Sequence, residues 1–294
     1  MRLRLGTRGS RLALVQSELV AARLREAGHA VELVTIVTEG DIRPIDMSPG
    51  EGVFVTALER ALVADEIDLA VHSAKDIPLE ERRELVIAAY PERADPRDAL
   101  ITRSGGASIS TLHAGATVGT NSPRRTGFLR ALRPDLRIVP LHGNVDTRLR
   151  RLDAGAVDAL VIAAAGVDRL GLAARIDARL ALDEVAPAPG QGALAVQVRS
   201  NDLDAGDVIR SIDDIDVHFA VQLEREVLKA TGGTCRAPVG ALATIEAETV
   251  DLLVAGVNSD GSDKRIERIK SSRAEALVAA SEAGARLVAQ VALR

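Results

Sequence analysis

The feature that most constrains the fold is the regular alternation of short apolar runs with longer amphipathic segments. Residues 3–6, 31–37 and 68–71 are strand-like runs, whereas residues 10–27 and 53–64 carry apolar side chains at helical spacing. Segments in this β-α-β-α-β order predict a mostly parallel sheet that is covered by helices on both faces. We therefore expect an α/β unit at the start of the chain.

The same pattern restarts near Asp98. Strands are expected at residues 117–119, 137–141 and 159–163, and helices at residues 124–132 and 144–154. This predicts a second α/β unit of similar size. Residues 193–198 form one further strand candidate, which can return to the first unit and make that unit discontinuous.

The last part of the chain has a different order of elements. One helix is expected before, and one after, a row of three strand-like stretches. These elements cover residues 217–230, 240–246, 249–257, 264–269 and 273–292. A helix followed by consecutive strands predicts a small α+β domain with an antiparallel sheet of three strands.

Prolines and glycines mark two junctions between these parts, around Pro91 and Pro96 and again between Pro187 and Gly192. The chain is long enough for two or three domains. We expect three: an α/β lobe of residues 1–93 and 190–212, a second α/β lobe of residues 94–189, and an α+β domain of residues 213–294.

Composition and charge limit the kinds of partner that the protein is expected to bind. The net charge is −5, and the 294 residues include three Phe, one Tyr and no Trp, whereas nucleic-acid-binding proteins concentrate basic and aromatic side chains. A single cysteine allows no intramolecular disulfide, which fits a reducing compartment. The first residues lack the apolar core of a signal peptide, and no uncharged apolar run reaches membrane-spanning length. We expect a cytoplasmic protein with no nucleic-acid or membrane partner.

Residues 70–78 leave an apolar strand and become polar at once, which places His72, Ser73, Lys75 and Asp76 at one strand end. Ligands of open α/β sheets bind beyond the carboxyl ends of the strands. Asp76 is therefore a candidate general acid and base. From the spacing alone, an exposed ion pair between Lys75 and Asp76 is slightly favoured, because such pairs are common and contribute little.

Arginines gather in loops that lead into helices. Thr120 and Ser122 precede Arg124 and Arg125 at a helix start, where hydroxyl groups cap the helix and anions bind. The guanidinium group binds carboxylates through two parallel hydrogen bonds. This loop is an anion-site candidate, and a solvated helix face is an equally good interpretation.

A second loop repeats this design, with His142, a glycine turn, Asn144 as the expected cap, and Arg148 in the first turns. Arg169 follows another apolar strand and would be unremarkable alone. Near the start of the chain, Ser10 is the expected N-cap of the first helix, and Arg8 in the turn before it indicates a negatively charged neighbour.

Cys235 lies in a glycine-rich loop between a helix and a strand, next to Arg236. A lone cysteine is usually buried and inert. Here the neighbouring glycines leave room for a bulky group, and a cation lowers a thiol pKa, which favours a reactive or modified thiol. One cysteine and five scattered histidines show no metal-ligand spacing, so no metal site is expected.

Taken together, these segments resemble the porphobilinogen deaminase (hydroxymethylbilane synthase) family. The V-H-S-x-K-D-x-P stretch from Val71 and the P-G-Q-G-A stretch from Pro189 are its most specific motifs here. The similar segments occur in the family's order and cover nearly the whole chain. They are residues 6–10, 71–78, 95–99, 118–125, 143–149, 163–171, 187–192 and 232–238.

The resemblance implies two α/β lobes similar to those of periplasmic binding proteins of type II, and a third domain that bears the cofactor cysteine. It implies a dipyrromethane cofactor, made from two substrate units and joined to Cys235 by a thioether. The implied enzyme is a monomeric transferase that deaminates four porphobilinogen molecules in turn, joins them head to tail, and releases the linear tetrapyrrole hydroxymethylbilane by hydrolysis.

The resemblance also implies roles for individual residues. Asp76 would be the catalytic acid and base, and Cys235 the point of cofactor attachment. The positions that match cofactor- or substrate-binding residues of the family are Arg8, Ser10, Ser73, Lys75, Thr120, Ser122, Arg124, Arg125, His142, Asn144, Arg148, Arg169 and Gln191.

Four positions depart from the family pattern. His142 stands where Arg is common, which weakens one anion contact and makes it pH-dependent. Glu51 stands where Lys is often found, in a candidate lid. Thr234 replaces a glycine beside the cysteine, and Pro123 replaces an aliphatic residue. All four bear on affinity and lid behaviour, and none removes Asp76 or Cys235.

The alternative hypothesis is a two-lobed module that binds a small organic anion without catalysis. The missing export signal and the cysteine-bearing third domain argue against it. A covalent adduct on Cys235 would separate the two hypotheses, since a binding module needs none.

Overall fold

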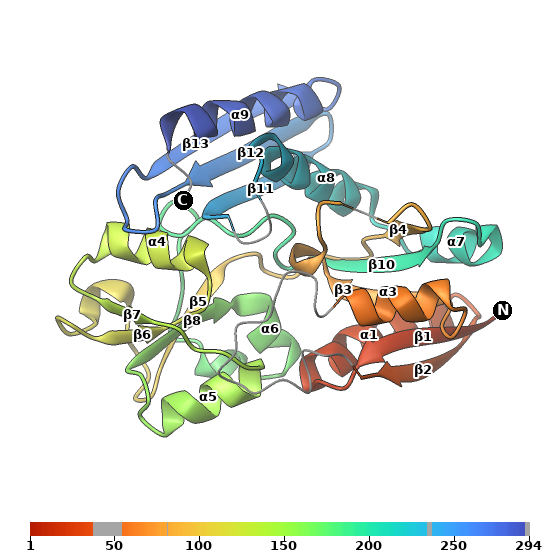
Figure 1. Ribbon diagram of the computed structural model, residues 1–294, viewed down its shortest axis with the longest axis horizontal. Helices are drawn as coiled ribbons and strands as arrows, with labels where there is room; N and C mark the ends of the chain where they lie inside the picture. Colours follow the sequence, from red (N-terminus) through yellow and green to blue (C-terminus); the bar gives the residue numbers. More distant parts are fainter. Residues whose placement is uncertain (38–54, 81, 234–236, 292–294) are drawn as a thin grey trace. The chain divides into compact units, whose positions relative to one another are not determined.

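Figure 1 shows the computed structural model, which describes residues 1–37, 55–80, 82–233 and 237–291. The chain divides into two compact units. Unit 1 comprises Met1–Ala94 and Ala193–His218, and unit 2 comprises Asp95–Gly192 and Phe219–Arg294.

Unit 1 contains a mixed five-stranded sheet in the order β2-β1-β3-β10-β4. Its strands are β1 (Arg2–Arg8), β2 (Ala30–Ile36), β3 (Leu69–Ser73), β4 (Leu85–Ala89) and β10 (Leu194–Arg199). β1 is parallel to β2 and β3, whereas β10 is antiparallel to both β3 and β4. The expected late strand therefore joins this sheet, and it does so in the antiparallel sense.

Helices cover both faces of this sheet, as the strand-helix alternation predicted. α1 (Arg11–Glu26) and α7 (Leu203–Arg210) share one apolar cluster with the strands, to which Leu69 and Val71 of β3 belong. α3 (Thr56–Val63) packs on the opposite face, against Ala70. Because side chains alternate along a strand, His72 shares the α3 face with Ala70, and Ser73 shares the α1 face.

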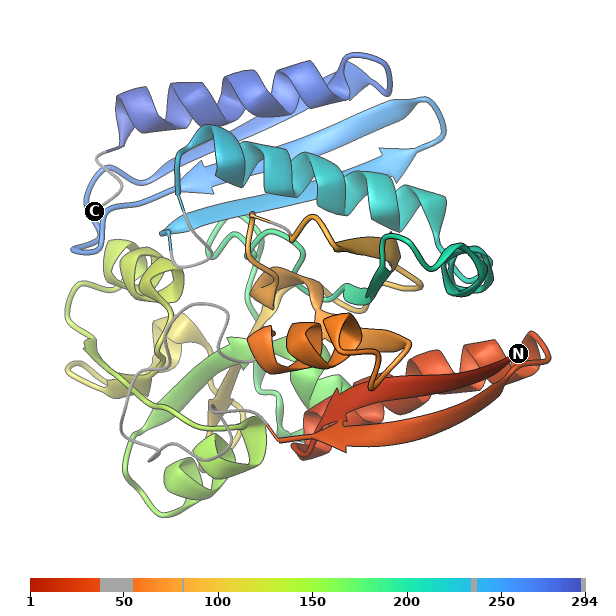
Figure 2. The same ribbon diagram turned by 45° about the vertical axis from the view of Figure 1, so that its right-hand side comes forward.

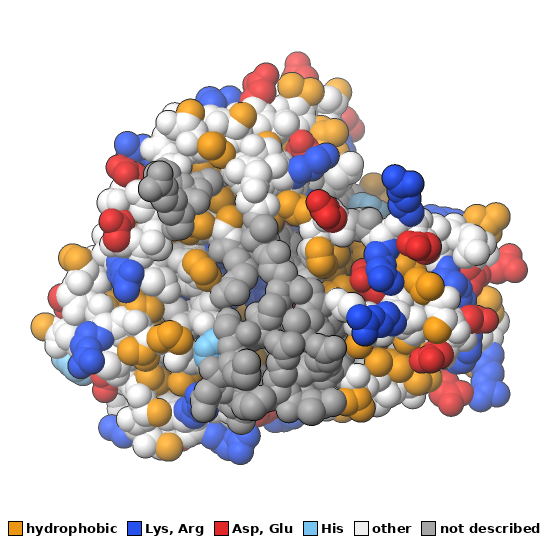
Figure 3. Space-filling view, viewed as in Figure 1, with side chains coloured by type: hydrophobic (Ala, Val, Ile, Leu, Met, Phe, Trp, Pro, Cys, Tyr) orange, Lys and Arg blue, Asp and Glu red, His pale blue; other side chains and the backbone are white. Residues whose placement is uncertain are grey.

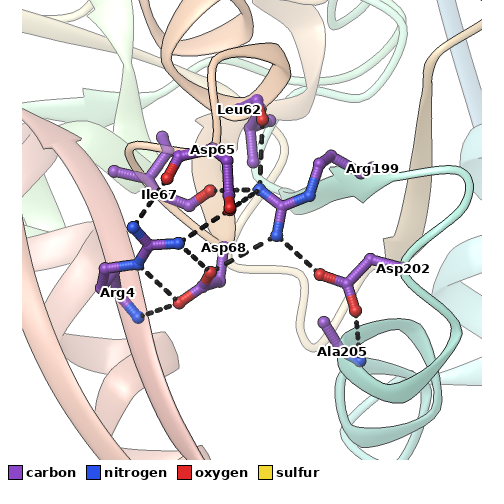
Figure 4. A network of polar contacts seen from close by, with 8 residues as sticks. All are labelled: Arg4, Leu62, Asp65, Ile67, Asp68, Arg199, Asp202 and Ala205. Atoms are coloured by element: carbon purple, nitrogen blue, oxygen red, sulfur yellow. Dashed lines mark hydrogen bonds and ion pairs between the residues drawn. The ribbon is translucent and has the colours of Figure 1, made fainter.

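Figure 4 shows a network of ion pairs in unit 1, formed by Arg4, Asp65, Asp68, Arg199 and Asp202. Asp68 accepts hydrogen bonds from the backbone N–H of Arg4 (2.7 Å) and from its Nη2 (2.6 Å). Arg199 bridges Asp68 (3.4 Å) and Asp202 (2.6 Å), and Asp202 caps α7 by accepting from the Ala205 N–H. The network thus joins β1, β3, β10 and α7.

Unit 2 contains a second mixed sheet, in the order β7-β6-β8-β5-β9. Its strands are β5 (Asp98–Thr102), β6 (Thr117–Gly119), β7 (Arg137–Val139), β8 (Ala159–Ala163) and β9 (Ala178–Arg179). β6 is parallel to β7 and β8, while β5 is antiparallel to β8 and β9. Its helices are α4 (Pro123–Leu132), α5 (Val145–Asp153) and α6 (Ala164–Arg169).

The last part of the chain forms an antiparallel sheet of β11 (Val239–Glu246), β12 (Thr249–Gly256) and β13 (Arg265–Ser272). α9 (Ala276–Gln290) packs on β12 and β13, and α8 (Ile215–Ala230) touches α9 at Gly284 (Figure 2). The expected fold class is confirmed: two mixed α/β sheets and one antiparallel sheet of three strands.

Several short elements were not expected from the sequence. They are β4, β5, β9, α6, α7 and three single turns of 3₁₀ helix, η1 (Ala74–Asp76), η2 (Ile109–Thr111) and η3 (Ala173–Arg175). α6 and α7 contain Gly166 and Gly206, and glycine weakens a helical pattern. No helix in the described part of the chain is long and apolar enough to cross a membrane. On the face drawn in Figure 3, Lys and Arg side chains of the described residues lie among Asp and Glu side chains.

Candidate active site

The loop after β3 holds the candidate acid and base. Asp76 ends the 3₁₀ turn η1, which is anchored by the buried side chains of Ala74 and Ile77 and by a hydrogen bond from the Ala74 N–H to the Ala193 carbonyl (3.0 Å). The Asp76 carboxylate is exposed. The spacing had slightly favoured an exposed side chain here, and the exposed carboxylate on an anchored turn is available to a ligand.

Further candidate residues lie at the same carboxyl edge of the unit 1 sheet. The Ser73 hydroxyl accepts a hydrogen bond from Nε2 of the buried Gln16 in α1 (2.9 Å). Ser10 caps α1, as expected, with its Oγ 3.3 Å from the Ala13 N–H. Arg8 ends β1, and Lys75 lies in η1 beside Asp76. Since β1 and β3 are parallel, all five candidate residues of unit 1 gather at one edge.

Three buried polar side chains next to this edge of the sheet are joined by hydrogen bonds. His72 Nε2 lies 3.1 Å from Oε1 of Gln197 in β10, and Nε2 of Gln197 donates to Oε1 of Glu59 in α3 (3.2 Å). All three side chains are buried. Burial lowers the pKa of His72 to about 4, with a smaller lowering from the charge of Arg8 and an opposing effect of Gln197. His72 is therefore neutral at pH 7.

The paired arginines of unit 2 converge on one buried carboxylate. Arg125 donates from Nε (3.0 Å) and Nη2 (2.8 Å) to Oδ1 of Asp98, and Nη1 of Arg124 lies 2.9 Å from Oδ2. Arg124 also donates to the carbonyl of Ala186. Asp98 has no exposed surface, and the two arginines are almost fully buried. We had expected Arg124 and Arg125 to be anion-binding residues of a loop. In the structure they instead form a buried cluster with Asp98.

Electrostatics explain how Asp98 stays charged in this cluster. Burial alone would raise its pKa, but the charges of Arg124 and Arg125 outweigh burial and hold the pKa well below the usual range. Burial also lowers the pKa of the Arg124 guanidinium, against the raising effect of Asp98. A guanidinium nevertheless stays protonated at neutral pH. One carboxylate thus faces two guanidinium groups, which leaves positive charge in excess.

Gln191 belongs to the same cluster. Its Nε2 donates to the Pro96 carbonyl (2.7 Å) and to Oδ1 of Asp98 (2.9 Å), and its side chain is fully buried. The sequence singled out Gln191, Arg124 and Arg125 separately. It did not single out Asp98, whose only signal was its place in the 95–99 segment that resembles the family.

The start of α4 matches its prediction more closely. Ser122 caps the helix by accepting from the Arg125 N–H (3.4 Å), and Pro123 follows at the first helical position, where no N–H is needed. The buried Thr120 donates its backbone N–H to Val139 (3.0 Å), which ties the loop to β7.

The start of α5 departs from prediction in one respect. Asn144 occupies the N-cap position, but its side chain makes no capping hydrogen bond, so the capping prediction is wrong. Gly143 has a φ of 108°, which a non-glycine residue rarely adopts, and this conformation turns the chain into the helix. Arg148 donates from Nε to the Gly143 carbonyl (2.8 Å), and His142 is partly buried just before the turn.

Arg169, at the end of α6, donates from Nη2 to the Gly192 carbonyl (2.8 Å). Its neighbour Asp168 is paired through both carboxylate oxygens with Arg179, at 2.8 Å each, and Arg179 also pairs with Asp95 (2.9 Å). Arg169 is therefore held next to the segment that contains Gln191.

Cys235, the predicted cofactor anchor, lies outside the described residues, as do Thr234 and Glu51. Among the residues that the structure does describe, no group of three or more His, Cys, Asp or Glu side chains could hold a metal ion.

Two family profiles match the chain. Residues 3–207 match the profile described as "Porphobilinogen deaminase, dipyromethane cofactor binding domain", and residues 218–292 match "Porphobilinogen deaminase, C-terminal domain". Similar curated proteins carry the name porphobilinogen deaminase. That of Acidothermus cellulolyticus is 47% identical over 267 residues, covering 88% of this chain and 80% of the relative. That of Corynebacterium efficiens is 42% identical over 299 residues, covering 99% and 98%.

Among solved structures, the methionine-binding protein MetQ aligns with 76% of this chain and 94% of its own, at 17% identity and a TM-score of 0.46. The second substrate-binding domain of a putative amino acid ABC transporter from Streptococcus pneumoniae aligns with 79% and 95%, at 15% identity and a TM-score of 0.47.

Proposed function

Since the chain belongs to the porphobilinogen deaminase family, a family of transferases, we propose that Asp76 and the arginine loops carry the reaction on a dipyrromethane cofactor held by Cys235. The observation that supports this most strongly is the excess of guanidinium over carboxylate in the buried cluster of Arg124, Arg125 and Asp98. Such a cluster favours an anionic ligand.

The chemistry of this cluster fits the cofactor. Each pyrrole unit carries an acetate and a propionate, so a dipyrromethane brings four carboxylates. Nε of the buried Arg124 donates to no described residue. An unsatisfied buried donor costs about 1–3 kcal/mol, and a ligand carboxylate within reach would remove that cost. Arg124 and Arg125 would hold such carboxylates, and Cys235 would form the thioether.

When bound, the cofactor would supply the pyrrole carbon to which the first substrate unit is joined, and each later unit would be joined to the end of the growing chain. Loss of ammonia from porphobilinogen leaves a cationic azafulvene. The Asp76 carboxylate stabilises that cation, and it accepts and returns protons at pyrrole nitrogens. Its exposure on an anchored turn supports this role, because the carboxylate is accessible while its position is fixed by Ala74 and Ile77.

The remaining candidate residues bind the substrate side chains. Arg8, Arg148 and Arg169 pair with acetate and propionate groups, and Lys75 adds a fourth cation. Hydroxyl and amide groups complete the polar contacts, which are those of Ser10, Ser73, Thr120, Ser122, His142, Asn144 and Gln191. The proposed domains are residues 1–93 with 190–212, 94–189 and 213–294, and the proposed form is a cytoplasmic monomer.

Replacement of Asp76 tests this assignment. Asp76→Asn keeps the shape of the side chain and removes its charge, so we expect kcat to fall by about 10²–10⁴-fold, the usual contribution of a positioned acid or base. Because Asp76 is exposed, the melting temperature should not change. Glu80→Gln is the matched control, since Glu80 is a second exposed carboxylate of the same loop. Normal turnover by Asp76→Asn would refute the role.

A further inference from the structure

Glu224 of α8 is a fully buried carboxylate to which the proposed function gives no role. Both of its oxygens accept hydrogen bonds from backbone N–H groups. Oε1 accepts from Ala243 of β11 (2.9 Å), and Oε2 accepts from Gly190 (2.7 Å). All three residues belong to unit 2, in which α8 lies beside β11 (Figure 1). One side chain therefore joins the antiparallel sheet to the glycine that precedes Gln191.

The edge of this sheet explains one of the two hydrogen bonds. β11 is an edge strand in the order β11-β12-β13, and an edge strand presents N–H groups that no neighbouring strand accepts. The Ala241 N–H donates to the Pro187 carbonyl (3.0 Å), and two residues on, the Ala243 N–H donates to Glu224. Pro187 and Glu224 thus occupy successive acceptor positions along β11.

The turn from Ala188 to Gln191 explains the other hydrogen bond. The Gln191 N–H donates to the Ala188 carbonyl (2.9 Å), with Pro189 second in the turn and Gly190 third, at a φ of 74°. Proline at the second position and a positive φ at the third are typical of a type II turn. The turn's own hydrogen bond uses the N–H of the fourth residue, so the Gly190 N–H needs a different acceptor, which Glu224 supplies.

The residue after Gly190 is a member of the buried arginine cluster. Nε2 of Gln191 donates to the Pro96 carbonyl (2.7 Å) and to Oδ1 of Asp98 (2.9 Å), and Nη2 of Arg125 donates to Oε1 of Gln191 (3.4 Å). Hydrogen bonds weaken steeply as their distances and angles depart from the preferred range. The Gln191 amide group can therefore make these contacts only if the backbone of its turn is held in place.

We propose that Glu224 is a positioning residue for Gln191: its carboxylate fastens the Gly190 turn to β11 and thereby holds the Gln191 amide group in the cluster of Asp98 and Arg125. This inference rests on the proposed function, in which Gln191 binds the ligand. It adds a residue of α8 that acts on the site through the backbone.

A carboxylate suits this position better than any other side chain of its length. It carries acceptors only, so each of its two oxygens can meet one N–H group. The amide group of a glutamine would turn an NH₂ toward Gly190 or Ala243, and a methionine would leave both N–H groups without a strong acceptor. Buried polar groups without partners are costly, so both substitutions should loosen the turn, methionine more than glutamine.

The first test follows the Gly190 amide in the full chain by NMR. Labelling with ¹³C-carbonyl proline and ¹⁵N-glycine selects glycines that follow a proline, which are Gly50 and Gly190, and Gly50→Ala assigns the two signals. We expect the Gly190 amide proton to resonate downfield, because hydrogen bonds to carboxylates are short and strong. It should move upfield in Glu224→Met and by less in Glu224→Gln. The same Gly190 shift in all three proteins would overturn the proposal.

The second test is a double-mutant cycle on KM for porphobilinogen. We expect Glu224→Met to raise KM by about tenfold, the scale of coupling within one hydrogen-bond network, with a smaller change in kcat. In a Gln191→Ala background the same substitution should add little. Independent effects in the two backgrounds would show a merely structural role and refute the proposal. If Glu224→Met does not fold, Glu224→Gln takes its place in the cycle.

Glu226→Gln is the matched control for both tests. Glu226 lies on the same helix and pairs with Lys229 (3.7 Å), whose side chain is exposed. We expect this variant to leave both KM and the Gly190 signal unchanged. If Glu226→Gln altered them as much as the Glu224 variants do, the effect would belong to α8 in general, and the specific role of Glu224 would be refuted.

The two tests also separate this inference from the proposed function. If the protein carries no cofactor and Asp76→Asn is fully active, the proposed function fails, while the Gly190 signal can still depend on Glu224. If the cofactor is present and the cycle shows no coupling between Glu224 and Gln191, the proposed function stands and the role of Glu224 is refuted.

Discussion

Arg125 donates two hydrogen bonds to a single oxygen of Asp98, at 3.0 and 2.8 Å, and both side chains are buried. The other oxygen of Asp98 faces Arg124 at 2.9 Å. Removing the charge of Asp98 would leave two buried guanidinium groups without their carboxylate. We expect Asp98→Asn to lower the free energy of unfolding by about 3–5 kcal/mol, the usual cost of breaking a buried ion pair.

Urea unfolding at pH 7 measures this loss. Asp135→Asn is the matched control, because Asp135 also pairs with an arginine, Arg133 at 2.7 Å, but at the surface, where such pairs contribute little. Equal effects of the two substitutions would contradict the importance of burial. The pKa of Asp98 is lowered in the folded state, so its contribution is full above about pH 3.8 and is lost as the pH falls through the folded pKa below that.

The ion-pair network around Asp68 should also stabilise unit 1, and this stabilisation too should be lost as the pH falls. Burial alone would raise the pKa of Asp68, but hydrogen bonds from Arg4 outweigh it and lower the pKa. We expect Asp68→Asn to cost about 1.5–3 kcal/mol at pH 7, the scale for hydrogen bonds to charged groups, and less below pH 3.8. Thermal unfolding measures this. Glu32→Gln, in the exposed pair with Arg2, is the control and should change little.

Arg148 and Arg150 provide a matched pair on one helix, α5. Arg148 is held toward the Gly143 turn, whereas Arg150 is exposed and contacts Thr147. We expect Arg148→Gln to raise KM for porphobilinogen by about tenfold or more, because a hydrogen bond between charged groups is worth about 1.5–3 kcal/mol. Arg150→Gln should leave KM unchanged. Steady-state kinetics would contradict the assignment if both variants behaved alike.

His142 can be tested by restoring the residue that is common in the family. His142→Arg places a permanent cation before the Gly143 turn. We expect it to lower KM for porphobilinogen, because a guanidinium group binds a carboxylate through two parallel hydrogen bonds. An unchanged KM would show that position 142 does not contact the substrate.

Helix starts and strands could be predicted where the residues that mark them are close together in the sequence. Ser10 and Ser122 cap their helices as expected, since a hydroxyl residue before an apolar periodic run marks a helix start. The three antiparallel strands at the end of the chain were also found from alternation and turn residues. α6 was missed because six residues that include a glycine carry too little helical periodicity.

The pairings across the fold could not be predicted, because they depend on which strands become neighbours. Asp98 begins β5 and meets Arg125 of α4 only when the second sheet is assembled. Gln197 likewise reaches His72 only because β10 returns beside β3. Sequence spacing alone gave no sign of either contact.

The covalent cofactor is the central claim, and the intact mass of the denatured protein tests it most directly. The protein should be purified from cells that make porphobilinogen, beside a Cys235→Ala control. We predict a mass excess of two porphobilinogen molecules less two ammonia molecules, mapped to the peptide that contains Cys235 and absent from the control. The bare polypeptide mass, unchanged after incubation with porphobilinogen, would contradict the account.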